Sequence, residues 1–126
     1  MNSIAIKNNQ QIPIASIPIA DYHDFIIFNT SLLKLDKNHC VNYFGIPESD
    51  KVKLFCCIAN DNEQTILISS SIIEKDKSYP SFSERHLAFE KFEREIHENY
   101  GITYTNHPWL KPVRYAYDRP NKSETI

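Results

Sequence analysis

The chain is poor in glycine, with only two glycines among its 126 residues. Nucleotide sites of the Rossmann and P-loop kinds need several glycines at fixed spacing so that the backbone can approach phosphates closely. Cys-x-x-Cys and His-Glu-x-x-His motifs are missing as well, and these are common local ligand sets for zinc and iron–sulfur clusters. The sequence therefore predicts no catalytic, cofactor-binding or metal-binding residues.

Cysteine is also scarce, and the three cysteines are Cys40, Cys56 and Cys57. An odd number without a leader sequence does not suit a disulfide framework. Cys56 and Cys57 are adjacent in a predicted strand, so their side chains point to opposite faces and cannot hold one metal ion together. We expect all three to be reduced and to pack as small apolar side chains.

Long apolar runs and an excess of positive charge are both absent. The longest runs, such as residues 25–28 and 52–59, are far shorter than the roughly 20 residues that a membrane helix needs. Fourteen basic residues stand against sixteen acidic ones, a net charge of −2, so nothing neutralises a nucleic-acid backbone. We expect a cytoplasmic chain that binds no nucleic acid.

The first two-thirds of the chain carries patterns for one helix and several strands. Alternating isoleucines interrupted by two prolines over residues 12–19 favour an edge strand or an extended arm. Apolar residues at three- and four-residue spacing predict an amphipathic helix over 20–35 that begins near Asp21, unless Asn-Thr-Ser at residues 29–31 interrupts it. Strands are predicted over residues 40–46, 51–60 and 64–73. The last two carry apolar residues on both faces, which favours interior positions in a sheet.

A second helix is predicted from residue 83 to Tyr100. Ser83 is a suitable N-cap residue, and Gly101 suits the left-handed position that ends a helix. The class is therefore α+β: an open-faced sandwich in which an antiparallel sheet carries two helices mainly on one face. We expect one domain over residues 1–103, with 1–11 flexible, and an extended C-terminal docking tail over residues 104–126.

Two clusters could carry function. Glu93 and His97 stand at i,i+4 on the second helix, which would let a carboxylate orient an imidazole for acid–base chemistry; the alternative is a solvated or docking face, which the absence of an accompanying nucleophile favours. Residues 105–115 combine Trp, His and basic side chains with two prolines, which is typical of a recognition arm. The alternative is that Trp109 and Leu110 merely cover the domain's own core.

Three motifs resemble those of a known family: Tyr-Pro-Ser-x-Ser over residues 79–83, Phe-Glu-Arg-Glu-Ile-x-Glu-x-Tyr-Gly-Ile over 92–102, and His-Pro-x-Leu-Lys-Pro-Val-Arg over 107–114. They resemble the signature of the 30 kDa subunit of complex I (NADH-quinone oxidoreductase), the small hydrophilic subunit of the peripheral arm. The resemblance is greatest to component G, or to the N-terminal domain of the large subunit, in formate-hydrogenlyase-type NiFe hydrogenases. Glu98 stands where Asp is usual, and Asn106 where Gly usually precedes His-Pro.

This resemblance implies a cofactor-free structural subunit that supports electron transfer in a complex I-like or NiFe hydrogenase complex, with no active site of its own. Its implied partners are a large catalytic subunit and an iron–sulfur small subunit, and it would lie on the cytoplasmic side of the cell membrane through the complex. The implied interface residues are Glu93, Arg94, Glu95, Glu98, His107, Trp109, Lys111 and Arg114. The alternatives are a stand-alone α+β domain that binds a small molecule or regulates, and a small acid–base enzyme that uses Glu93 and His97.

Overall fold

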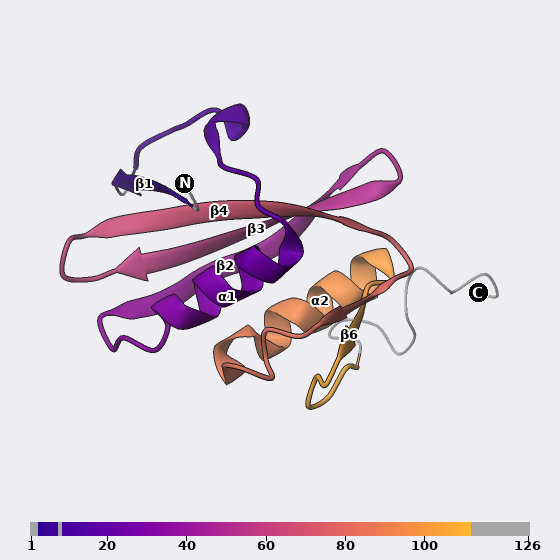
Figure 1. Ribbon diagram of the computed structural model, residues 1–126. Coiled ribbons are helices and arrows are strands. Elements are labelled where there is room, and N and C mark those ends of the chain that lie inside the picture. The colour runs from indigo at the N-terminus through magenta and orange to yellow at the C-terminus, as the bar shows by residue number, and fades with distance from the viewer. Residues whose placement is uncertain (1–2, 8, 112–126) are drawn as a thin grey trace.

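A four-stranded antiparallel sheet forms the centre of the computed structural model, which describes residues 3–7 and 9–111 (Figure 1). Its strands lie in the order β1-β4-β3-β2. The bounds are β1 (Ile4–Lys7), β2 (Asn38–Glu48), β3 (Lys51–Asn60) and β4 (Thr65–Glu74). The three strands predicted from the sequence are confirmed as β2 to β4. Strand β1 was not predicted. It pairs with β4, although it lies in the segment that was expected to be flexible.

The first helix, α1 (Tyr22–Leu32), begins where the sequence predicts. The side chain of Asp21 accepts a hydrogen bond from the Asp24 N–H at 2.9 Å, which satisfies one of the free donors at the helix start. Asn29 and Thr30 do not interrupt the helix. Their side chains donate to backbone carbonyls one turn earlier, at 2.9 and 2.6 Å, so the polar groups are satisfied inside the helix.

Both long helices cover one face of the sheet, as Figure 1 shows, and the predicted open-faced α+β sandwich is confirmed. Alternate residues of β3 point into the core on that face, among them Leu54 and Cys56. On the other face, Ile14 and Ile17 lie beside Cys57. Ile14 is the first residue of the short 3-10 helix η1 (Ile14–Ser16), and Ile17 follows its last residue. The N-terminal segment therefore explains why β3 is apolar on both faces, and the two adjacent cysteines point to opposite faces as predicted.

The second helix begins later than the sequence predicts. A 3-10 turn, η2 (Leu87–Phe89), leads into α2 (Glu90–Tyr100), and the side chain of His86 caps the 3-10 turn. Ser83 is not the cap: its hydroxyl donates to the Glu93 carboxylate at 2.6 Å instead. The predicted helix start was therefore wrong, because a tertiary contact uses the side chain that would have capped the helix. The predicted end is confirmed, since Gly101 has φ 74° and donates to the His97 carbonyl.

Two short strands bring distant parts of the chain together beside α2. Strand β5 (Ser78–Pro80) pairs in parallel with β6 (Thr103–Thr105), which spans the expected boundary between residues 103 and 104. The Tyr104 hydroxyl lies 3.2 Å from that of Tyr43 in the core. This pairing places the loop after β5 next to the segment after β6. Neither helix in the described part of the chain has the length and apolar character needed to cross a membrane.

Gly45→Ala is expected to destabilise the domain. A Cβ atom at this position of β2 would lie 2.8 Å from Val52 Cγ1 on β3 and 3.2 Å from the Tyr100 ring on α2, so the side chains of both would have to move. Such overpacking costs about 1–3 kcal/mol of the free energy of unfolding. Urea denaturation followed by circular dichroism measures the change, and an unchanged midpoint would show that the space beside Gly45 is larger than the structure indicates.

Candidate functional site

The centre of the motif region is a fully buried carboxylate. Glu93, on the first turn of α2, accepts three hydrogen bonds from the loop that follows β5. The donors are the Phe82 N–H at 2.6 Å, the Ser83 N–H at 3.2 Å and the Ser83 hydroxyl at 2.6 Å. Glu93 therefore fixes the loop to the helix.

Burial and hydrogen bonding act on this carboxylate in opposite directions. Burial raises the pKa of Glu93 to about 7, and the three hydrogen bonds from Phe82 and Ser83 limit the rise because they favour the charged form. The carboxyl group consequently binds a proton more tightly in the folded chain than in the unfolded one. Its contribution to stability is complete below its usual pKa of 4.5 and is lost as the pH rises through about 7.

We therefore expect the free energy of unfolding to fall between about pH 4.5 and pH 7 by an amount on the order of 3 kcal/mol from this group alone. The measurement is urea denaturation of the wild type and of Glu93→Gln at half-unit pH steps. The informative quantity is the difference between the two proteins at each pH, because it isolates the contribution of the Glu93 carboxyl group. A difference that did not change with pH would contradict the assignment.

His107 attaches the C-terminal segment to the same end of α2. Its Nε2 lies 3.0 Å from the Glu90 carbonyl and 3.9 Å from Glu93 Oε1, and its Nδ1 accepts from the Trp109 N–H at 3.0 Å. A neutral imidazole protonated on Nε2 satisfies this pattern, with one donor and one acceptor. The preceding Asn106 has φ 60°, and Asn tolerates this conformation better than most residues. Asn106 is thus compatible with the turn.

Arg94 holds the next part of the segment. Its Nε donates to the Lys111 carbonyl at 2.9 Å, and its guanidinium lies 4.5 Å from the centre of the Trp109 ring. Its Nη1 also donates to Glu90 Oε1 at 3.4 Å. Trp109 stays 56% exposed on the outer side of this stack, whereas Leu110 packs against the core. Leu110 thus covers the core, as one of the two expectations had it, whereas Trp109 does not, and the recognition arm stays a prediction.

The structure brings together five of the eight residues predicted to form the interface: Glu93, Arg94, His107, Trp109 and Lys111. Glu95 is half-buried on α2, and Glu98 is fully buried on the last turns of that helix. Arg114 lies outside the described residues. Glu93 is fully buried in this cluster, whereas Trp109 and Lys111 are exposed.

Glu93 and His97, the pair considered from the sequence, are not arranged for acid–base catalysis. Glu93 has no exposed surface and faces the loop at residues 82–83, while His97 Nδ1 lies 2.7 Å from the Ile102 carbonyl. Across the described ranges, no group of three or more His, Cys, Asp or Glu side chains is placed to hold a metal ion. This cluster therefore positions polypeptide, and a carboxylate without access to solvent does not reach a substrate.

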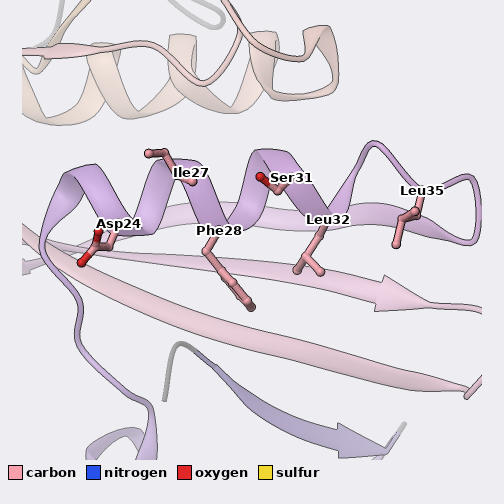
Figure 2. A pocket seen from close by; sticks show the side chains of 6 residues that line it. All are labelled: Asp24, Ile27, Phe28, Ser31, Leu32 and Leu35. Carbon is pink, nitrogen blue, oxygen red and sulfur yellow. The ribbon is translucent and has the colours of Figure 1, made fainter.

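A second surface was not predicted from the sequence. An open groove of about 540 Å³ runs along the outer stripe of α1 and the turn after it. Figure 2 shows the six side chains that line it. They are Asp24, Ile27, Phe28, Ser31, Leu32 and Leu35. The sequence did carry a signal for this surface, because apolar residues in this helix are spread around more of its circumference than one buried face requires.

Comparison with known proteins agrees with the motif region. A family model described as "Respiratory-chain NADH dehydrogenase, 30 Kd subunit" matches residues 16–122. The C/D subunit of NADH-quinone oxidoreductase from Psychrobacter arcticus is 26% identical over 127 residues, which cover 90% of this chain and 22% of that protein. The protein of the same name from Cronobacter sakazakii is 29% identical over 69 residues, 55% of this chain and 11% of that protein. The chain thus spans less than a quarter of the length of these curated relatives.

Proposed function

Because the chain belongs to the family of the 30 kDa subunit of respiratory-chain NADH dehydrogenase, we propose that it is a cofactor-free structural subunit that docks onto the catalytic large subunit of a complex I-like assembly. The observation that carries this proposal is the family match over residues 16–122, which includes both the folded core and the motif region. The use of a buried carboxylate to fix polypeptide supports a structural role.

The motif residues have an indirect part in this proposal. Glu93 fixes the loop after β5, His107 attaches the C-terminal segment to α2, and Arg94 supports Trp109. Together they determine where residues 104–111 run and what they present. The docking tail proposed for residues 104–126 would then begin from a fixed point, which lowers the entropy lost when it binds.

The proposed partners are the large catalytic subunit of the complex and an iron–sulfur small subunit. Both relatives described above are named as C/D subunits and are several times longer than this chain, so a part similar to this chain occurs there in one polypeptide with further sequence. In this account the chain supports electron transfer by positioning the large subunit, and it lies on the cytoplasmic side of the membrane through the complex. The resemblance to component G of NiFe hydrogenases rests on the motifs alone, and a proton-reducing complex stays a prediction.

The test is affinity purification of the tagged full chain from its own cells in mild detergent, with the bound proteins identified and quantified by mass spectrometry. We expect the large subunit of an NADH-quinone oxidoreductase and an iron–sulfur protein in fixed ratio to the chain. A hydrogenase large subunit in their place would establish the hydrogenase form. A chain that is purified alone, in repeated experiments, would make the stand-alone binding domain the better account.

A further inference from the structure

A small apolar pocket lies on the face of the sheet that is turned away from α1 and α2. Figure 1 shows η1 on this side of the sheet. Ile14 and Ile17 line the pocket from the η1 segment, and Phe44, Ile46 and Phe55 are among the residues that line it from the sheet. Every lining residue has an apolar side chain or a thiol, and the pocket has a volume of about 130 Å³. Because an engineered apolar cavity of about 150 Å³ binds benzene, this pocket has room for a group of about six carbons.

One cation lies on the same face, at the edge of the pocket. Lys53 alternates with Leu54 on β3, so its side chain leaves the sheet on the side of Phe55. Its cross-strand neighbour on β2 is Ile46, which lines the pocket. Its Nζ lies 5.5 Å from the centre of the Phe55 ring, which lines the pocket as well. The ammonium group therefore borders the apolar walls.

Lys53 is buried without an anionic partner. The residue is only 9% exposed, and it has no hydrogen bond or ion pair with any residue that the structure describes. Lysine side chains are almost never buried to this degree unless they are paired, because a desolvated ammonium group is costly. The Phe55 ring offsets part of this cost through its π face. An anion supplied by a ligand would offset much more of it.

The other charges on this face leave the ammonium of Lys53 available. Lys51 is exposed at the start of β3, in one row with Glu48 and Glu74. The carboxylate of Glu74 forms its ion pair with the turn after β4. On the opposite side of Phe55, burial raises the pKa of the Cys57 thiol to about 11, so this group is neutral at pH 7. No acidic side chain lines the pocket itself.

We propose that this pocket binds a small organic anion, a carboxylate with an apolar tail of about six carbons. The tail would lie between η1 and the sheet, over Phe44 and Phe55, and the carboxylate would accept a charge-assisted hydrogen bond from Lys53 Nζ. A neutral hydrocarbon would leave the ammonium unpaired, and a tail much longer than six carbons would exceed the volume. This binding site is additional to the proposed function and does not depend on it.

The first test compares three ligands that share one tail. The full chain, labelled with ¹⁵N, is titrated with hexanoate, 1-hexanol and hexylammonium, and the amide shifts and the Kd values are measured by NMR. We expect hexanoate to shift the amides around Phe44, Phe55 and Ile14 in a saturable way. Hexanol should bind about tenfold more weakly, because it lacks the charged acceptor, and hexylammonium should bind most weakly. Equal affinities for hexanoate and hexanol, or shifts that do not saturate, would overturn the proposal.

The second test uses two pairs of matched variants, each shown by thermal melting to be folded. Lys53→Met keeps the apolar stem and should abolish the preference for hexanoate over hexanol, whereas Lys51→Met, on the same face, should retain it. Ile14→Asp places a negative charge on the pocket wall and should weaken hexanoate binding at least about tenfold. Ile19→Asp is the control, because Ile14 and Ile19 are 55% and 56% exposed but Ile19 does not line the pocket. A Lys53→Met chain with an unchanged preference for hexanoate, or equal weakening by both Asp variants, would place the anion elsewhere and contradict the proposal.

Discussion

Glu93→Ala is expected to lower the free energy of unfolding by about 3 kcal/mol or more, because it leaves several buried donors without an acceptor. The donors are the backbone N–H groups of Phe82 and Ser83 and the Ser83 hydroxyl, all of which point at the missing carboxylate. A buried N–H that loses its partner costs the full desolvation penalty, and two of them lie on adjacent residues here.

Glu93→Gln is the matched control for this result. It keeps one acceptor oxygen and nearly the same volume, so its loss of stability should be smaller, on the order of 1 kcal/mol. Chemical denaturation at pH 6 gives both values. If Glu93→Ala unfolded at the same denaturant concentration as the wild type, the loop at residues 82–83 would be held by something other than Glu93.

Trp109→Ala is expected to weaken assembly with the large subunit by about tenfold while leaving the melting temperature of the isolated chain nearly unchanged. Trp109 is 56% exposed, and the Arg94 guanidinium lies over its ring at 4.5 Å from the ring centre. An exposed ring on a rigid support contributes little to the fold and much to an interface that buries its other side.

The comparison for this experiment is Arg94→Ala. Arg94 donates to the Lys111 carbonyl as well as supporting the indole, so its loss should lower both assembly and the stability of the isolated chain. Leu87→Ala, which removes an apolar side chain of a residue that is 70% exposed, is the neutral control. If Trp109→Ala lowered the melting temperature as much as it lowered binding, the indole would serve the fold and not the interface.

The parts of the fold that were predictable from the sequence are those with strong local patterns. Strand β3 covers ten residues and carries apolar side chains on both of its faces. Both faces therefore had to be covered by other parts of the chain, and α1 and the η1 segment cover them. The start of α1 and the end of α2 were predictable because Asp21 and Gly101 act on backbone groups within their own turn.

The parts that were not predictable depend on contacts between distant residues. Ser83 has the chemistry of an N-cap, but Glu93 binds it from across the loop, so the helix starts later. Strand β1 has only four residues, too few for a clear local pattern, and it pairs with the edge of β4. A local pattern cannot reveal which of two possible partners a side chain takes.

The candidate site was predictable in composition but not in role. Five of the predicted residues do lie together, yet Glu93 and Arg94 direct their hydrogen bonds into the chain itself. Whether Glu93 and Arg94 are buried depends on the path that the segment after β6 takes along α2. The pairing of β5 with β6 fixes where that segment begins. The groove along α1 was missed because the apolar residues over 20–35 were read as one amphipathic face, whereas the structure buries Phe25 and Ile26 and leaves Ile27 and Leu35 exposed at the groove.

The central claim, that this chain is a structural subunit, is tested most directly by removing it. The gene is deleted in its own organism, and the complex that contains the large catalytic subunit is measured by native gel electrophoresis and by its NADH-dependent activity. The account predicts that the assembled complex and its activity are both lost and that the wild-type chain restores both. A fully assembled and active complex in the deletion strain would contradict the account.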